Sequence, residues 1–248
     1  VKTPSQNYHS YIHLIDSAGN AIYQSDQLPG PWFRPPKGWD TYYLQQDSHE
    51  LRIPKGAPGG LYWPVVGVYE IYQMNRMAVT VNGQRVEGDV YRLPPIKVIG
   101  APAKPPIAHE ARFDDGFRLL GYGLKIPDEG LYPGTQFAVT LYYRSDAKTD
   151  KDYTRFFHLY NPEFGLAAQA DSPPQGGINP TWSWVPGETI VDTVTLQVAE
   201  TAAPGEYRLF TGFYDAQADA VRLGVQDEAG QPLPDGGVVL ETIEVKAR

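Results

Sequence analysis

The sequence predicts an all-β protein made of two tandem antiparallel β-sandwich domains, of immunoglobulin-like or jelly-roll type, the first lacking its N-terminal strands. Glycine and proline account for 25 and 23 of the 248 residues, which favours short elements joined by turns over long helices. The 17 tyrosines, 9 phenylalanines and 5 tryptophans suit pleated, half-buried surfaces. A third observation, an internal repeat, indicates that the chain holds two copies of one unit.

The repeat appears when the chain is shifted by 145 positions and compared with itself. Identical residues then recur in the same order without a gap, which indicates a tandem duplication. A further shift of one residue also aligns Arg76 with Arg222. Identical pairs at the main offset include His13 and His158, Gln24 and Gln169, Asp26 and Asp171, Trp39 and Trp184, Asp47 and Asp192, Gly67 and Gly212, and Tyr69 and Tyr214.

The two copies differ at their beginnings. The second opens with a leader, 112–152, that contains strand-like runs at 117–125 and 136–144; in the latter, apolar residues alternate as one buried strand face requires. The counterpart of this leader would lie before residue 1, and Val1 does not resemble a native start. Because an incomplete sandwich exposes unpaired strand edges, we expect the first domain to be a reduced sandwich of about six strands or to be completed by a strand-adding contact.

Domain boundaries follow from a proline-rich stretch between the copies. We predict a first domain at 1–99, a semi-stiff linker at 100–108 and a complete second domain at 109–248. Turn signals such as Pro186-Gly187 and Pro204-Gly205 separate short runs in the second domain. Besides the two runs of the leader, we predict strands at 153–160, 165–170, 189–198, 206–214, 220–226 and 238–246.

Charge and composition exclude several classes of function. The net charge of −8 argues against nucleic-acid binding, and the absence of cysteine excludes disulfides, thiolate metal sites and cysteine nucleophiles. No apolar run reaches the length of a membrane span. Residues 8–98 hold eight basic and eight acidic side chains, whereas residues 109–248 hold eleven and twenty-one, so the exposed faces of the copies have diverged.

The repeated histidines and aspartates are the first candidates for chemistry. His13 and His158 each lie mid-strand, with Asp26 and Asp171 one hairpin later, and a histidine oriented by a carboxylate is half of a nucleophilic triad. We nevertheless interpret the set as a structural framework, because no serine or threonine recurs as a nucleophile and a framework is needed in both copies. The framework residues are His13, Asp26, Trp39, Asp47, His158, Asp171, Trp184 and Asp192.

Other catalytic and metal sites are less favoured by the sequence. A glycosidase would need two acids about 5–10 Å apart across a cleft, and none of the 29 acidic residues is singled out for that role. Five scattered histidines do not indicate a zinc site. We therefore predict no catalytic residue, metal ligand or cofactor. A structural calcium ion, held by Asp114 and Asp115 or by the loop 146–152, stays open as an alternative.

The tryptophans bear on carbohydrate binding, in which flat rings stack on sugar faces. Trp39 and Trp184 recur at one repeat position, so we expect both to lie in the core between sheets. Trp32, Trp63 and Trp182 have no identical partner, and they are the candidates for an exposed glycan-binding platform.

The second copy also carries a series of motifs that suggests a family. It reads Leu120-Gly-Tyr, Phe157-His-Leu159, Gln169-Ala-Asp-Ser-Pro173, Asn179-Pro-Thr-Trp-Ser-Trp184, Pro204-Gly-Glu-Tyr207 and Gly212-Phe-Tyr-Asp215. This series resembles the β-sandwich modules that follow the membrane-spanning part of bacterial polyprenyl-phosphate-sugar-dependent glycosyltransferases of the mannosyltransferase-like family, and modules of related extracytoplasmic proteins. The resemblance extends over residues 112–247 and, more weakly, over 8–98. The catalytic acids of such enzymes belong to the membrane portion, so the resemblance carries no catalytic residue to this chain.

Three functional hypotheses follow. The resemblance implies a non-catalytic region outside the cytoplasm or at the cell surface, the tail of a membrane-tethered glycosyltransferase-like protein, that contacts glycan or polypeptide acceptors or acts as a scaffold. An autonomous carbohydrate-binding module is the alternative, and a hydrolase is the least favoured.

Overall fold

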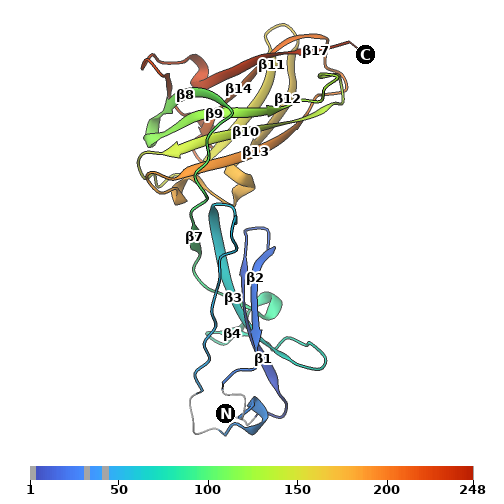
Figure 1. Cartoon of the computed structure of the whole chain (residues 1–248), viewed down its shortest axis with the longest axis vertical. Helices are drawn as coiled ribbons and strands as arrows, with labels where there is room; N and C mark the ends of the chain where they lie inside the picture. Colours follow the sequence, from blue (N-terminus) through green and yellow to red (C-terminus); the bar gives the residue numbers. More distant parts are fainter. Residues whose placement is uncertain (1–3, 31–33, 41–44, 248) are drawn as a thin grey trace. The chain divides into compact units, whose positions relative to one another are not determined.

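The computed structural model describes residues 4–30, 34–40 and 45–247 of the chain. Within these residues it contains strands and short 3-10 helices and no α-helix, so the predicted all-β class is confirmed. The chain divides into a first unit, residues 1–57 and 61–98, and a second unit, residues 58–60 and 99–248 (Figure 1). No helix in the described part of the chain has the length and apolar character needed to cross a lipid bilayer.

The second unit is a β-sandwich of two five-stranded antiparallel sheets. Its back sheet has the order β13-β10-β9-β8-β16, and its front sheet has the order β12-β11-β14-β15, with β17 also paired to β14. The strands are β8 (Ile107–Phe113), β9 (Phe117–Lys125), β10 (Gln136–Ser145), β11 (Tyr153–Asn161), β12 (Gly165–Ser172), β13 (Thr189–Gln197), β14 (Gly205–Asp215), β15 (Val221–Arg222), β16 (Val225–Asp227) and β17 (Gly237–Val245).

Aromatic side chains from both sheets meet at the centre of this sandwich. The ring centroid of Phe213, on β14, lies 5.2 Å from that of Phe113, 5.0 Å from that of Phe117 and 5.1 Å from that of Tyr143. Trp184 is only 2% exposed, and its centroid lies 6.3 Å from that of Phe213. The indole Nε1 donates a hydrogen bond of 2.9 Å to the carbonyl of Asn179, so the one polar group of the ring is satisfied inside the core.

Two strands differ from the sequence prediction. β8 begins at Ile107, inside the predicted linker. Its residues Ala111 and Phe113 alternate into the core, although His109 and Glu110 just before them are polar. The predicted strand at 220–226 is divided between β15 and β16. The division occurs where the chain leaves the front sheet and joins the back sheet, which one continuous straight strand cannot do.

The described residues of the first unit form one five-stranded sheet, with the order β2-β1-β3-β6 and β7 paired to β3, and a separate β4-β5 hairpin. Its cluster of fully buried apolar residues is correspondingly small: Leu14, Tyr62 and Val98. The strands are β1 (Tyr8–Ile15), β2 (Ala21–Gln27), β3 (Gly60–Glu70), β4 (Thr80–Val81), β5 (Gln84–Arg85), β6 (Tyr91–Arg92) and β7 (Ile96–Val98).

The described residues of the first unit contain no strands equivalent to the leader strands of the second, and this accounts for the difference between the units. In the second unit β13 pairs with β10, which belongs to the leader. Residues 45–52 of the first unit are the repeat counterpart of β13, and they lie in no strand. For the same reason Trp39 is half-buried rather than enclosed between two sheets, which corrects the expectation that it lies in a core like Trp184. Its Nε1 still donates to a carbonyl five residues earlier, that of Arg34, at 2.8 Å.

The strand that carries the repeated histidine and its two neighbours have the same register in both units. His13 lies opposite Gln24 on β2 and Val65 on β3, and His158 lies opposite Gln169 on β12 and Phe210 on β14. Each of these pairings in the second unit lies 145 positions after its counterpart in the first. The duplication seen in the sequence is therefore a duplication of the β1-β2-β3 sheet geometry.

Replacement of Trp184 by alanine should destabilise the second unit by about 3–5 kcal/mol, because the cavity left between the sheets cannot refill. Trp182, which is 41% exposed, provides the matched control, and its alanine variant should change stability by less than about 0.5 kcal/mol. Urea unfolding followed by fluorescence measures both changes. Equal stabilities for the two variants would contradict the core position.

Candidate functional site

The repeated histidine–aspartate pairs lie on the outward face of their sheets, away from the core. His13 Nε2 lies 2.7 Å from Asp26 Oδ1, a hydrogen-bonding distance. His158 Nε2 lies 3.7 Å from Asp171 Oδ1, which is too long for a hydrogen bond, so the two side chains are hydrogen-bonded in the first unit and only close to each other in the second. Burial lowers the pKa of His158 more than the charge of Asp171 raises it, and Arg222 lowers it further.

In both units an arginine packs over an aromatic ring on the same outward face as the histidine. The guanidinium of Arg76 lies 5.7 Å from the ring centroid of Tyr11, and that of Arg222 lies 4.5 Å from the centroid of Phe156. Each arginine also donates from Nη1 to a backbone carbonyl, Arg76 to Gly88 at 3.3 Å and Arg222 to Asp235 at 2.9 Å. The repeated arginine therefore ties a loop to the outward face of the sheet through a cation–π contact and one hydrogen bond.

Glycine is required beneath these rings. A Cβ atom on Gly67 would lie 2.6 Å from Cζ of Tyr11, and one on Gly212 would lie 2.7 Å from Cζ of Phe156. Any larger residue would displace the ring on which the arginine rests, which explains why glycine occupies this position in both copies.

The second repeated aspartate has a buried structural role. Asp192 and Arg155 are each 1% exposed, and Arg155 Nε donates to Asp192 Oδ2 at 3.0 Å. The other guanidinium nitrogens donate to the carbonyl of Ala170 and the hydroxyl of Ser172, and the backbone N–H of Gln175 donates to Asp192 Oδ1. This fully hydrogen-bonded ion pair joins the front sheet to β13 through the core.

Asp47, the counterpart in the first unit, has different partners that include a histidine and a serine. Ser10 and Gln27 donate to its carboxylate, and His49 Nε2 lies 3.0 Å from Oδ2. Burial opposes ionisation of Asp47, but the hydrogen bonds from Ser10, Gln27 and His49 together hold its pKa below the ordinary value. The sequence comparison missed His49, because its counterpart is Val194 and it has no identical repeat partner.

This serine–histidine–aspartate cluster does not have the geometry of a nucleophilic triad. Ser10 Oγ lies 3.0 Å from His49 Nε2, the same nitrogen that faces Asp47, whereas a triad places nucleophile and acid on opposite ring nitrogens. Ser25 Oγ lies 3.3 Å from the other nitrogen, Nδ1. Ser25 is, however, not among the residues that line the adjoining 370 Å³ cavity. The arrangement thus acts as a hydrogen-bond network at the position of the Arg155–Asp192 pair.

Two of the three candidate platform tryptophans lie within the described residues, one in each unit. Trp182 is 41% exposed in the second unit, while Trp63, in the first unit, is half-buried with the guanidinium of Arg92 only 4.1 Å from its ring centroid. Trp32 lies outside the described residues.

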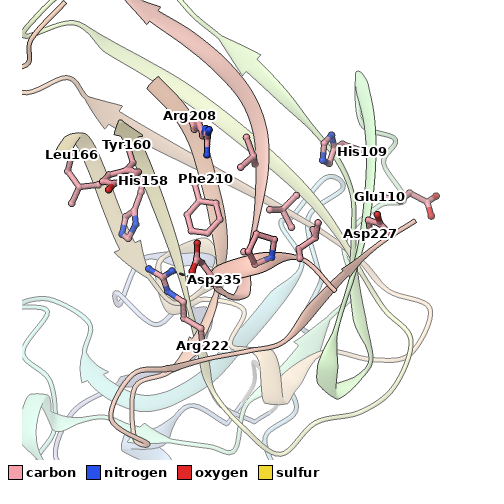
Figure 2. Close-up of a pocket in the computed structure, with 15 residues that line it drawn as sticks. His109, Glu110, His158, Tyr160, Leu166, Arg208, Phe210, Arg222, Asp227 and Asp235 are labelled. Carbon is pink, nitrogen blue, oxygen red and sulfur yellow. Dashed lines mark hydrogen bonds between the residues drawn. The ribbon is translucent and has the colours of Figure 1, made fainter. Parts of the chain in front are cut away.

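A groove of about 650 Å³ on the second unit is the strongest candidate site. Its floor is the outward face of β11, β14 and β17, and the 3-10 turn Pro234–Gly236 forms one wall (Figure 2). The lining residues are His109, Glu110, His158, Tyr160, Leu166, Arg208, Phe210, Arg222, Asp227, Leu233, Pro234, Asp235, Gly237, Val238 and Val239.

Strand register arranges the polar and aromatic groups of this groove. Tyr160 lies directly opposite Arg208, and His158 lies directly opposite Phe210, so two rings and two nitrogen-bearing side chains alternate on one surface. Tyr160 is 41% exposed. None of the lining residues in the described chain is a serine, threonine or cysteine, and the groove offers aromatic rings together with hydrogen-bonding imidazole, guanidinium, carboxylate and phenol groups.

Two of the aspartates considered as calcium ligands are engaged with other side chains. Asp115 accepts hydrogen bonds from Tyr153 and Thr149, and Asp146 pairs with Arg118 at 2.6 Å and Arg144 at 3.4 Å. The described residues contain no cluster of three or more histidine, aspartate or glutamate side chains placed to hold a metal ion.

Replacement of Asp192 by alanine should destabilise the second unit by about 3–5 kcal/mol, because Arg155 would remain buried without a counter-charge. The double variant Arg155→Met/Asp192→Leu should regain much of that loss. Asp146→Ala, which removes a half-exposed ion pair, should cost less than about 1 kcal/mol. Chemical denaturation of the three variants tests the assignment, and a milder effect for Asp192→Ala than for Asp146→Ala would contradict it.

The lowered pKa of His158 predicts a pH-dependent stability. Below the ordinary histidine pKa of about 6.5, the unfolded chain takes up a proton that the folded chain resists, so the free energy of unfolding should fall as pH decreases from 7 toward 5. His158→Gln should show a smaller decrease over the same window. Urea titrations at several pH values measure both slopes, and identical slopes would contradict the prediction.

Comparisons with known proteins give a distant similarity of fold. No protein-family model and no curated protein matches the sequence. The chain is similar to the crystal structure of the C-terminal domain of Wzt, with 12% identity and a TM-score of 0.38, over 60% of this chain and 82% of that one. It is also similar to a protein of Corynebacterium diphtheriae described as membrane-anchored, with 9% identity and a TM-score of 0.24, over 98% of this chain and 53% of that one. These similarities assign neither a family nor an activity.

Proposed function

We propose that the chain is a non-catalytic glycan-contacting region and that the groove on the second unit makes the contact. One observation carries this proposal: the exposed ring of Tyr160 and the ring of Phe210 lie beside Arg208, His158 and Arg222 in one open groove. Flat rings can stack on the apolar faces of sugars, while guanidinium and imidazole groups donate hydrogen bonds to ring hydroxyls. A concave surface with few convergent polar groups is the usual form of a ligand site.

The setting that we propose for this contact is outside the cytoplasm, in the tail of a membrane-tethered glycosyltransferase-like protein. The motif series between Leu120 and Asp215 supports this setting through its resemblance to such tails. The contact would then hold a glycan or polypeptide acceptor near an enzyme centre elsewhere in the protein. An autonomous carbohydrate-binding module is the alternative, and it would use the same groove.

If the groove binds glycans, Tyr160→Ala should weaken binding by about tenfold or more. The stacking of a nucleic-acid base on an aromatic ring contributes roughly 1–3 kcal/mol, and we expect a similar contribution from stacking on a sugar face. Trp182→Ala is the matched control, since it removes an equally exposed ring that does not line the groove. Calorimetric titration of the full chain with neutral and acidic oligosaccharides provides the measurement.

Three outcomes would contradict the proposal. The first is an absence of binding to every oligosaccharide at millimolar concentration. The second is equal weakening by Tyr160→Ala and Trp182→Ala, which would place the contact outside the groove. The third is the release of new reducing ends during incubation, because it would show hydrolysis rather than binding.

A further inference from the structure

The left end of the groove in Figure 2 brings two arginines to one aromatic ring. Arg208 lies two residues before Phe210 on β14, and both side chains point outward on the same face. The guanidinium of Arg222 lies 5.5 Å from the ring centroid of Phe210. The two cations therefore flank the ring, Arg208 along its strand and Arg222 from the neighbouring strand β15 (Figure 2).

Neither guanidinium has a carboxylate partner within the described residues. Arg222 donates to a carbonyl, that of Asp235, rather than to a carboxylate, and Arg208 forms no ion pair there. Other arginines of the second unit do pair: Arg118 with Asp146 and Arg155 with Asp192. Residues 109–248 contain twenty-one acidic side chains, and none of those in the described part of the chain forms an ion pair with either arginine.

The carboxylates that line the groove are unequally distributed along it. Glu110 and Asp227 lie with His109 at the opposite end, on β8 and β16 (Figure 2). Asp227 Oδ1 also accepts a hydrogen bond from the backbone of Gln231, within its own turn. Asp235 alone lies beside the arginine end, on the turn that Arg222 holds. The groove is thus cationic at one end and acidic at the other.

We propose that the ligand is a glycan bearing an anionic group, a uronate carboxylate or a sugar phosphate, which Arg208 and Arg222 bind while the sugar packs on Phe210. This inference rests on the proposed glycan contact and adds the charge class of the ligand. Guanidinium groups match both anions because they donate two parallel hydrogen bonds and stay charged at all physiological pH values. Phe210 supplies the apolar surface between the two cations.

The test compares three panels of ligands on the full chain. They are neutral oligosaccharides of glucose, galactose and mannose, the corresponding uronic-acid oligosaccharides of the same length, and the 6-phosphates of the three sugars. At low ionic strength we expect at least one anionic ligand to bind about tenfold more tightly than its neutral counterpart, and added salt should reduce that difference. The second and third panels distinguish a carboxylate from a phosphate as the group recognised.

Variants of opposite charge sharpen the test. Arg208→Gln should weaken binding of the preferred anionic ligand by about tenfold and leave neutral ligands unchanged, whereas Asp235→Asn should strengthen the anionic ligand. Asparagine tolerates the positive φ of 58° at position 235, so the turn should persist. Arg112→Gln is the matched control, because it removes one positive charge from an exposed position on β8 that does not line the groove.

The results separate the two proposals. Equal affinity for neutral and anionic ligands, with no effect of Arg208→Gln, would overturn the anionic class while leaving the glycan contact in place. A loss of anionic binding in Arg112→Gln as large as in Arg208→Gln would also overturn it, because net charge rather than the groove would then be responsible. Absence of binding across all three panels would overturn both proposals.

Discussion

The packing of Phe213 against rings of the opposite sheet is the interaction on which the second unit depends. Phe113, Phe117 and Tyr143 approach it from three adjacent strands of the back sheet, at centroid separations of 5.0–5.2 Å. Trp184 closes the same cluster from the loop before β13. Because a β-strand alternates its side chains between faces, fixing these rings inward also fixes every residue that points outward.

The groove is a direct consequence of that alternation. On β11, Phe157 and Leu159 are fully buried, and His158 and Tyr160 therefore face the other side of the sheet. The inward position of Leu209 on β14 turns Arg208 and Phe210 outward in the same way. A shift of one residue in the pairing of these strands would bury the polar groups and expose the core residues. The packing of the core therefore also determines which side chains line the groove.

Comparison of the units shows what happens when the opposite sheet is reduced. Val68 stands where the second unit has Phe213, and the described residues of the first unit bring no leader strand against it. The buried Arg155–Asp192 ion pair is replaced by a hydrogen-bond network around Asp47, in a unit with a much smaller apolar cluster. The contacts on the outward face of the sheet are kept better than the core. In both units an arginine lies over an aromatic ring and donates a hydrogen bond to a loop carbonyl. These arginine contacts need only one sheet, whereas a packed core needs two.

The sequence itself determined the features that local pattern and the repeat encode. Alternation predicted the strands that became β9 and β10 to within one residue, and the identities at the offset of 145 fall on strands that have the same register in both units. It also led to the His13–Asp26 pair, because both residues lie on neighbouring strands of one hairpin. Periods of two residues and repeated identities are visible without knowledge of long-range contacts.

The tertiary structure alone decided the groove, the start of β8 and the network around His49. The groove joins residues from His109 to Val239, and most of its polar lining has no identical repeat partner. Such residues become neighbours only when β8, β14 and β17 are placed by packing of the two sheets, a contact between distant segments that no local pattern records. The exposure of a tryptophan is decided in the same way, because it depends on what covers the ring, and Arg92 reaches Trp63 only in the folded sheet.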